Sequence, residues 1–283
     1  MRRALLVLAA LAFVAPFPCF PQEQDAPLPV TIVEPDHPDL ARCWISGAGP
    51  KYFQWCISVH GNLQIKSPDI AGAYPVALVS NFDEGYVVSS SQGVHGCDAG
   101  RNEQPWGAVS VTYPSATSAL VTRTTADGKV KLDMKYTRDL NEYDVTIQTT
   151  VTNISGSQLT DVQVVRYARM FFSGPGLPDG YARVDRGDIS LWARPLSRSG
   201  PDSRPFGVSL SAPSVSTAYP VHTATDPYSW FLEAIPDWCN RWPTLFPFDE
   251  YPVDGDRVLW LGYVLGQLNP GQRKTVKFVY RRQ

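Results

Sequence analysis

The stretch EYDVTIQTTVTN, which spans Glu142–Asn153, decides the fold class of this chain. Every second side chain falls on one face of the extended backbone and is aromatic or β-branched: Tyr143, Val145, Ile147, Thr149 and Val151. The residues between them are polar, and this period of two is typical of a β-strand with one buried face and one wet face. The turn-forming sequence NISGS follows, and Leu159–Met170 is predicted to return as the partner strand.

Short stretches of the same kind occur on both sides of this strand, separated by turn residues. Ala126-Asp127-Gly128 is a strong hairpin signal, because Asp-Gly tolerates the positive φ that tight turns need. Asn81–Glu84 is predicted to form a turn between strands at Pro75–Ser80 and Gly85–Ser90. The remaining predicted strands cover residues 52–59, 62–65, 107–113, 119–124, 129–136, 188–194, 206–211, 257–265 and 274–280, with an edge strand at 29–33. The sequence therefore predicts an all-β protein, an antiparallel β-sandwich with long loops.

The overall composition is that of a folded globular protein. The chain is 43% hydrophobic and 18% charged, whereas a disordered chain has fewer apolar residues and a larger net charge. The net charge of −2 gives no electrostatic reason to expect a nucleic-acid partner. A Pro-rich, acidic leader at residues 21–42 precedes what we expect to be a single sandwich domain at residues 43–283.

The N-terminal residues have the pattern of a secretory signal peptide, predicted over residues 1–20. Arg2 and Arg3 supply the positive end, and the apolar stretch Ala4–Ala15 is too short to span a bilayer, which takes about 20 residues. The cleavage site stays open. A lipid anchor at Cys19 is the alternative, although the Pro-Phe-Pro sequence before it lacks the small residues of a lipidation signal. We expect a secreted or periplasmic protein without a membrane span.

Export places the cysteines in an oxidising compartment, where disulfides form. Apart from Cys19, four cysteines remain, and three pairings of them are open. We predict Cys43–Cys56, which closes a short loop across a hairpin, and Cys97–Cys239, which ties the first half to a late segment. Free buried thiols are the alternative. No Cys-x-x-Cys pair occurs, so we expect neither a zinc site nor another cofactor.

Two stretches, Val145–Val164 and Leu268–Phe278, resemble strands of bacterial extracellular immunoglobulin-like sandwich modules, including cell-adhesion-related ones. The resemblance implies that these are paired sandwich strands, with a Pro-Gly turn leading into the last one. The size and β content of the whole chain are also similar to those of galactose-mutarotase-like large sandwiches, from which we carry over no catalytic residue. Together these resemblances imply a large or elaborated immunoglobulin-like sandwich.

The segment 226–256 is unusually aromatic, and it is our candidate for a ligand-binding site. Exposed Trp and Tyr side chains form flat apolar platforms with polar edges, which suit stacking on sugar rings or contact with another protein. The predicted ligand-binding residues in this segment are Tyr228, Trp230, Trp238, Trp242 and Tyr251. The alternative is that these side chains pack inward and cap one end of the sandwich, because Trp is usually largely buried.

Signals for catalysis and for metal binding are weak. The acidic cluster Asp249, Glu250, Asp254 and Asp256 carries oxygen ligands that suit Ca²⁺, but its spacing matches no EF-hand loop and favours a solvated loop. No Gly-x-Ser-x-Gly or His-Glu-x-x-His motif occurs. His60, His95 and His222 are isolated in the sequence and are interpreted as turn or core residues.

The sequence favours an exported, non-catalytic protein that binds a glycan or an extracellular protein surface, or that plays a structural role. The alternative is a carbohydrate-active enzyme with carboxylates near the segment 226–256. It would pair Asp83 or Glu84 with Glu233 or Asp237 as acid and base, since glycosidases place two carboxyl groups about 5–10 Å apart.

Overall fold

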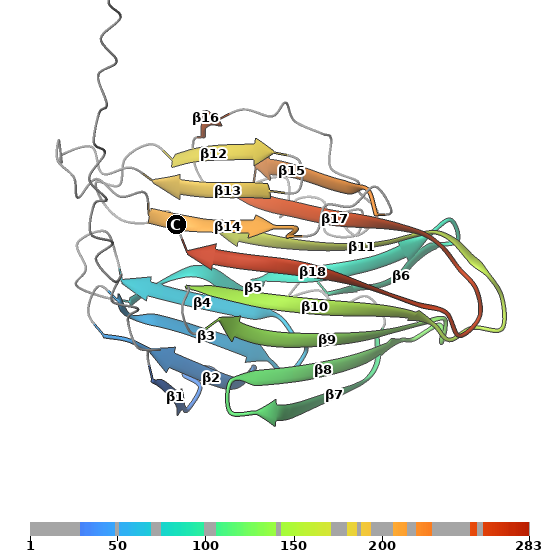
Figure 1. The fold of residues 1–283 in the computed structure, drawn as a ribbon, viewed down its shortest axis with the longest axis horizontal. Helices are drawn as coiled ribbons and strands as arrows, with labels where there is room; N and C mark the ends of the chain where they lie inside the picture. The colour runs from blue at the N-terminus through green and yellow to red at the C-terminus, as the bar shows by residue number, and fades with distance from the viewer. Residues whose placement is uncertain are drawn as a thin grey trace, which may run out of the picture.

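A computed structural model gives the fold of the chain. It describes residues 29–48, 51–68, 75–98, 106–139, 143–170, 180–185, 188–193, 206–213, 219–227, 250–253 and 257–282. These residues form two antiparallel β-sheets, and no helix occurs among them. The predicted all-β sandwich is therefore confirmed (Figure 1).

The first sheet contains nine of the described strands. In spatial order they are β1 (Val30–Val33), β2 (Leu40–Ser46), β3 (Phe53–Ser58), β4 (Leu63–Pro68), β5 (Pro75–Ser90), β11 (Leu159–Met170), β17 (Arg257–Leu268) and β15 (Val221–Pro227), and β6 (Gly93–Asp98) pairs with β5. The short strand β1 confirms the predicted edge strand near the N-terminus.

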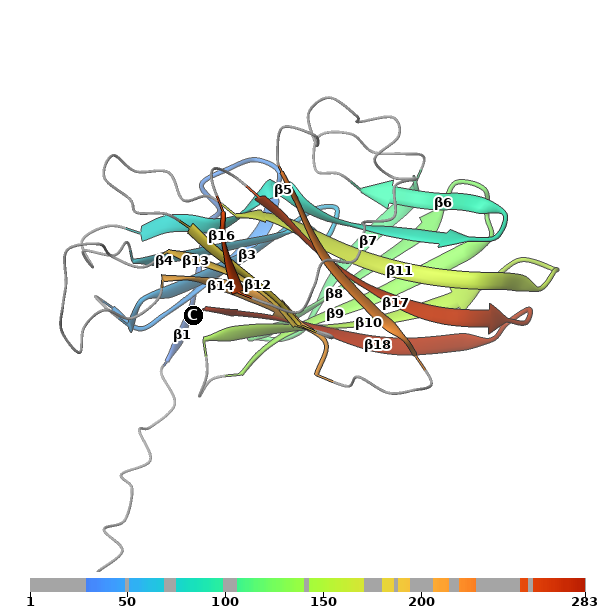
Figure 2. The same ribbon diagram turned by 90° about the horizontal axis from the view of Figure 1, so that it is seen from above.

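The second sheet also contains nine described strands. In spatial order they are β16 (Glu250–Val253), β12 (Gly180–Asp185), β13 (Asp188–Ala193), β14 (Phe206–Ser211), β18 (Arg273–Arg282), β10 (Asp144–Asn153), β9 (Val130–Asp139), β8 (Ser118–Thr125) and β7 (Trp106–Ser115). In Figure 1 the strands of each sheet are stacked from top to bottom, and β15 and β16 are the uppermost strands of their sheets. In Figure 2, β5 and β11 of the first sheet lie above β10 and β18 of the second.

Strand β10 has the alternation that its sequence predicts. Val145, Ile147 and Val151 are fully buried, whereas Gln148 between them is exposed. The buried face packs into the core between the sheets, and this burial provides most of the stabilisation of such a strand.

The predicted pairing of β10 with the strand that follows it is wrong. Strand β10 pairs with β9 and β18 of the second sheet, whereas β11 pairs with β5 and β17 of the first. The connection after Asn153 therefore crosses from one sheet to the other. The turn at Pro270–Gly271 makes the same crossing, from β17 to β18. A connection that crosses between two sheets, called an arch, uses the same turn residues as a hairpin within one sheet. The local sequence therefore does not distinguish the two.

The predicted turn at Asn81–Glu84 is also wrong, because β5 runs without interruption from Pro75 to Ser90. Polar residues are tolerated inside this strand because Glu84 finds buried partners there. By contrast, the predicted hairpin at Asp127-Gly128 is confirmed. It joins the paired strands β8 and β9, and Gly128 has a φ of 66°.

Aromatic side chains join β2 and β3 of the first sheet to β7 of the second, and these strands lie in the lower part of Figure 1. Trp44 on β2 stacks on Trp55 of β3 with ring centroids 4.0 Å apart. Tyr113 on β7 of the other sheet meets Trp44 edge-on at 6.2 Å. The Trp44 Nε1–H donates to the carbonyl oxygen of Ala116 at 2.7 Å, so this buried indole is satisfied across the sandwich.

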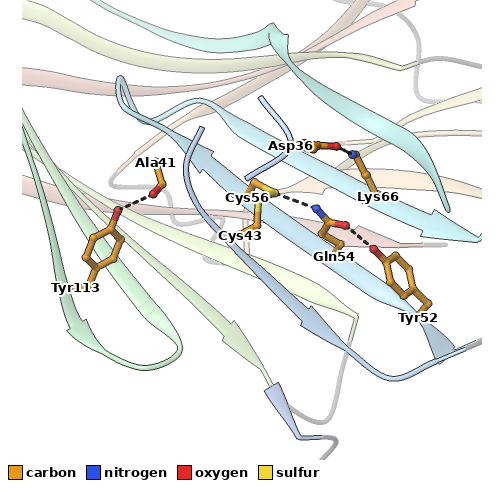
Figure 3. The surroundings of a disulfide bond; sticks show 8 residues. All are labelled: Asp36, Ala41, Cys43, Tyr52, Gln54, Cys56, Lys66 and Tyr113. Atoms are coloured by element: carbon orange, nitrogen blue, oxygen red, sulfur yellow. Dashed lines mark hydrogen bonds and ion pairs between the residues drawn. A yellow bond between two sulfur atoms is a disulfide. The ribbon is translucent and has the colours of Figure 1, made fainter. Parts of the chain in front are cut away.

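The disulfide Cys43–Cys56 is confirmed. The two residues lie opposite each other on β2 and β3, with Cα atoms 4.1 Å apart (Figure 3). The Gln54 side-chain amide lies beside it and donates to Cys56 Sγ at 3.3 Å. Cys97 is also disulfide-bonded. Its predicted partner, Cys239, lies outside the described residues, so that pairing stays a prediction.

Among the described residues, no helix has the length and apolar character needed to cross a membrane.

Candidate functional site

Two groups of polar side chains are candidates for function. The first is a core polar network between the sheets, formed by Asn62, Glu84, Tyr86, Asp98, Arg123, Tyr136, Arg166 and Tyr280. The second is a hairpin triad formed by Ser90, His95 and Asp127. Each side chain projects from a strand or a hairpin turn of the sandwich.

An ion pair between Glu84 on β5 and Arg166 on β11 is at the centre of the core polar network. Arg166 donates to Glu84 Oε1 from Nε at 2.9 Å and from Nη2 at 2.6 Å. From the opposite sheet, the Tyr280 hydroxyl donates to the same oxygen at 2.8 Å. The backbone N–H of Leu63 donates to Oε2 at 2.7 Å. The carboxylate therefore accepts hydrogen bonds from both sheets.

Burial controls the ionisation of these groups. It raises the pKa of Glu84, although Arg166, the Leu63 N–H and the Tyr280 hydroxyl all favour the charged carboxylate. Burial also raises the pKa of Tyr136 to about 12, so that its phenol keeps its proton at neutral pH. That phenol donates to the carbonyl oxygen of Gly61 and accepts from Arg166 Nη1 at 3.3 Å.

A second ion pair joins the sheets beside the first. Arg123 on β8 bonds Asp98 on β6, and its Nη1 also donates to the Tyr86 hydroxyl at 3.1 Å. The Asn62 amide donates to Asp98 Oδ1 at 2.8 Å and to the backbone oxygen of Glu84 at 2.6 Å. Asn62 thus connects the two ion pairs through the turn between β3 and β4.

The core polar network has the properties of a structural element. Glu84 and Asp98 are 0% and 1% exposed, and their carboxylates are held by arginines. A catalytic acid or base must come within hydrogen-bond reach of a substrate. Glu84, considered as a catalytic carboxylate from the sequence, is therefore assigned a structural role. The side chain of Asp83, together with Glu233 and Asp237, lies outside what the structure describes.

The hairpin triad lies where two hairpins meet. Ser90 ends β5, His95 is in β6, and Asp127 is in the turn between β8 and β9 of the other sheet. Ser90 Oγ is 2.7 Å from His95 Nε2, and His95 Nδ1 is 2.7 Å from Asp127 Oδ2. His95 is only 4% exposed. The burial of His95 agrees with its interpretation as a turn or core residue, but the sequence did not reveal its contacts with Ser90 and Asp127.

The Asp127 carboxylate is held in place by its own turn. Its Oδ1 accepts from the Thr125 hydroxyl at 2.6 Å and from the Lys129 N–H at 3.0 Å. Partial burial acts to raise the pKa of Asp127, but the hydrogen bonds from Thr125, His95 and Lys129 outweigh it and hold that pKa below its usual range. The carboxylate is therefore ionised at neutral pH and accepts a hydrogen bond from His95.

Most of the predicted ligand-binding residues lie outside the described residues: Tyr228, Trp230, Trp238 and Trp242. Tyr251 is in β16, opposite Ala182 of β12. The two ends of the aromatic segment are described. The chain leaves β15 at Pro227, which lies opposite Arg257, and the next described residue is Glu250 of β16.

Of the predicted acidic cluster, only Glu250 is described, at the start of β16. Asp249, Asp254 and Asp256 lie outside the described ranges. Within those ranges, no three His, Cys, Asp or Glu side chains are grouped closely enough to hold a metal ion.

Comparison with known proteins gives matches to solved structures at low sequence identity. No protein-family model and no curated protein sequence matches this chain. Among solved structures, a putative aldose 1-epimerase from Escherichia coli K12 has 12% identity and a TM-score of 0.44, with 90% of this chain and 99% of that chain covered. A bacterial glucoamylase complexed with acarbose has 10% identity and a TM-score of 0.44, with 84% of this chain and 30% of that chain covered.

An α-galactosidase from Geobacillus stearothermophilus has 9% identity and a TM-score of 0.34, with 85% of this chain and 40% of that chain covered. This chain therefore spans less than half of both the α-galactosidase and the glucoamylase. A second putative aldose 1-epimerase, from Klebsiella pneumoniae, has 12% identity and a TM-score of 0.40. No sequence or family match supports the resemblance to immunoglobulin-like modules.

Proposed function

We propose that this chain is an exported carbohydrate-binding protein, built on a large β-sandwich, that binds a glycan without cleaving it. Its sugar site would be formed by the aromatic residues between β15 and β16. The main support for the proposal is that this segment connects two edge strands, one from each sheet. Strand β15 is an edge of the first sheet, and β16 is an edge of the second.

The two edge strands lie on the same side of the sandwich. Both are at the top of Figure 1, and β15 contacts β12 and β13 of the opposite sheet. The segment that connects these two edge strands contains Trp230, Trp238 and Trp242 in its sequence. Aromatic rings at such a position can stack on a sugar ring, which has apolar faces and polar edges.

The proposal that the glycan is bound and not cleaved rests on the buried carboxylates. Glu84 and Asp98 bind arginines inside the core, so they are not available to act on a glycosidic bond there. A binding protein needs no acid–base pair. Its affinity comes from stacking and from hydrogen bonds at the rim of the site.

Thermal-shift measurements and isothermal titration calorimetry, with a panel of soluble glycans, test this proposal on the mature, oxidised protein. A glycan at 100 times its Kd should add about 2.7 kcal/mol to the free energy of unfolding and raise Tm by several degrees. Trp230→Ala, Trp238→Ala and Trp242→Ala are each expected to weaken binding by about tenfold or more.

Tyr113→Ala is the matched control, because Tyr113 is an aromatic residue on β7, at the opposite edge of the second sheet from β16. It is expected to leave the glycan affinity unchanged. If no glycan in the panel shifts Tm or releases heat with the folded protein, the proposal is wrong. Glycan binding followed by release of reducing sugar would instead favour the carbohydrate-active enzyme.

A further inference from the structure

The hairpin triad has the order of contacts that a serine nucleophile needs. Such a site places a hydroxyl next to an imidazole, and the imidazole next to a carboxylate that orients it. Here both contacts are 2.7 Å, from Ser90 Oγ to His95 Nε2 and from His95 Nδ1 to Asp127 Oδ2. The three residues come from two hairpins of opposite sheets, so this order is a product of tertiary structure.

The hydrogen-bond partners determine the tautomer of His95. An ionised carboxylate only accepts hydrogen bonds, so the contact with Asp127 requires the proton on Nδ1. In the neutral imidazole, Nε2 then carries a lone pair and faces the Ser90 hydroxyl. This tautomer is the one in which a histidine can take a proton from serine.

The Ser90 hydroxyl is oriented by the turn that follows it. Its oxygen accepts a hydrogen bond from the Gln92 N–H at 3.1 Å, so its own proton is left to donate toward His95. Ser90 is partly exposed, whereas His95 is 4% exposed. A partly exposed hydroxyl beside a buried base leaves the nucleophile accessible and shields the base from water.

A lysine holds the two hairpins together around the triad. Lys129 Nζ donates to Gln92 Oε1 at 2.9 Å and lies 3.9 Å from Asp127 Oδ2. Its contact with Gln92 links the turn of the second-sheet hairpin to the turn that follows Ser90. Contacts of Lys129, which is not part of the triad, therefore help to hold the two hairpins in the positions that bring Ser90, His95 and Asp127 together.

We propose that Ser90, His95 and Asp127 form a second functional site, an esterase centre that cleaves carboxylic esters through an acyl-serine intermediate. This activity goes beyond the proposed carbohydrate binding and is independent of it. Ser90 is the nucleophile, His95 is the general base and then the general acid, and Asp127 is a positioning residue.

In the first step, Ser90 Oγ attacks the ester carbonyl carbon while His95 Nε2 takes the hydroxyl proton. The tetrahedral adduct collapses, the bond to the alkoxy oxygen breaks, and His95 returns the proton to the departing alcohol. In the second step, water attacks the acyl-serine carbonyl and gives one proton to His95. The bond between the acyl carbon and Ser90 Oγ then breaks, and Oγ takes the proton back from His95. This releases the carboxylic acid and restores the free serine.

Two readouts on the full mature protein test the centre. A fluorophosphonate probe is expected to label wild-type protein at one site, located to Ser90 by mass spectrometry of peptides. p-Nitrophenyl acetate is the substrate, because its good leaving group makes the rate depend chiefly on the nucleophile and its base. Ser90→Ala is expected to abolish both labelling and turnover, and Asp127→Asn is expected to lower the rate by roughly 10²-fold or more.

Ser91→Ala is the matched control. Ser91 is the next hydroxyl on the same turn, but it bonds the Thr160 hydroxyl at 2.7 Å instead of a histidine. It is expected to keep labelling and turnover at wild-type levels. The proposal is overturned if folded wild-type protein is not labelled at Ser90, or if Ser90→Ala keeps the wild-type ester rate. Because glycan titration and ester turnover are separate measurements, failure of one proposal is distinguishable from failure of the other.

Discussion

Arg166 on β11 donates from both Nε and Nη2 to a single oxygen of Glu84 on β5, and the two residues are 1% and 0% exposed. A buried ion pair of this kind is costly to form, because both charges leave water. Its cost is offset only while every partner is present. This pair therefore makes the core sensitive to the loss of either member.

Replacing Arg166 with Met is expected to lower the free energy of unfolding by about 3–5 kcal/mol, because Glu84 is left buried without its counter-charge. Urea denaturation followed by tryptophan fluorescence measures the change. The double variant Glu84→Leu with Arg166→Met is expected to recover part of the loss, because it removes both charges. A double variant that is less stable than the single one would contradict this explanation.

The matched control for that experiment is an ion pair at the surface. Lys66 bonds Asp36, whose side chain is 57% exposed (Figure 3). Because water and salt screen such a pair, Lys66→Met is expected to cost only about 0–1 kcal/mol. Equal losses at Arg166 and Lys66 would show that burial is not the deciding factor.

Gly61→Ala is expected to destabilise the protein more than Gly271→Ala. Both glycines have positive φ, 93° and 74°, so both changes cost backbone strain of about 1–2 kcal/mol. A Cβ at Gly61 would also lie 3.1 Å from Met134, Tyr136 and Val121, whereas one at Gly271 meets nothing within 4 Å. The difference, roughly 1–3 kcal/mol, is measured by urea denaturation of the two variants. Equal losses would mean that the core around Gly61 adapts without cost.

Removing the disulfide by the double change Cys43→Ala and Cys56→Ala is expected to lower the free energy of unfolding by about 3 kcal/mol, because the bond closes a loop with a sequence separation of 13. Variants are compared instead of reduced protein, because Cys97 is disulfide-bonded as well. Peptide mapping without reductant provides the direct check. Free thiols at Cys43 and Cys56 in the oxidised protein would rule the bond out.

Asp127→Asn is expected to lower Tm at pH 7 and to have a smaller effect at pH 3. The pKa of Asp127 is lower in the folded chain than its usual value of 3.8. The folded state therefore favours the charged carboxylate, and the stability this adds is present above pH 3.8 and is lost as pH falls through the folded pKa. His95 and Lys129 are the charged or titratable groups that face this carboxylate.

Scanning calorimetry of both proteins at the two pH values measures that difference. A gap in Tm that stays constant from pH 7 to pH 3 would contradict the lowered pKa. This prediction concerns stability alone and holds whether or not the triad is catalytic.

Local patterns were enough to predict most of the strands. The alternation in Asp144–Asn153 predicts its buried face, and the Asp127-Gly128 turn predicts the hairpin between β8 and β9. The pair Cys43–Cys56 could be predicted because a hairpin brings nearby residues together. These features depend on residues close in sequence, for which backbone geometry limits the alternatives.

Sheet assignment could not be predicted in this way. The residues after Asn153 reverse the chain, but the same reversal serves a hairpin within one sheet and an arch between two sheets. The predicted turn at Glu84 is wrong because a polar residue inside a strand has the same local signal as a turn residue until its partner is known. That partner, Arg166, is 82 positions away.

Neighbouring residues are enough to specify the alternating strands and the local disulfide. The assignment of β10 and β11 to different sheets, and the meeting of Ser90, His95 and Asp127, depend on how distant parts of the chain pack together. His95 and Asp127 are 32 positions apart, and they come together only when two sheets close over a common core. That closure is driven by burial of apolar surface, which is non-directional and leaves no local motif in the chain.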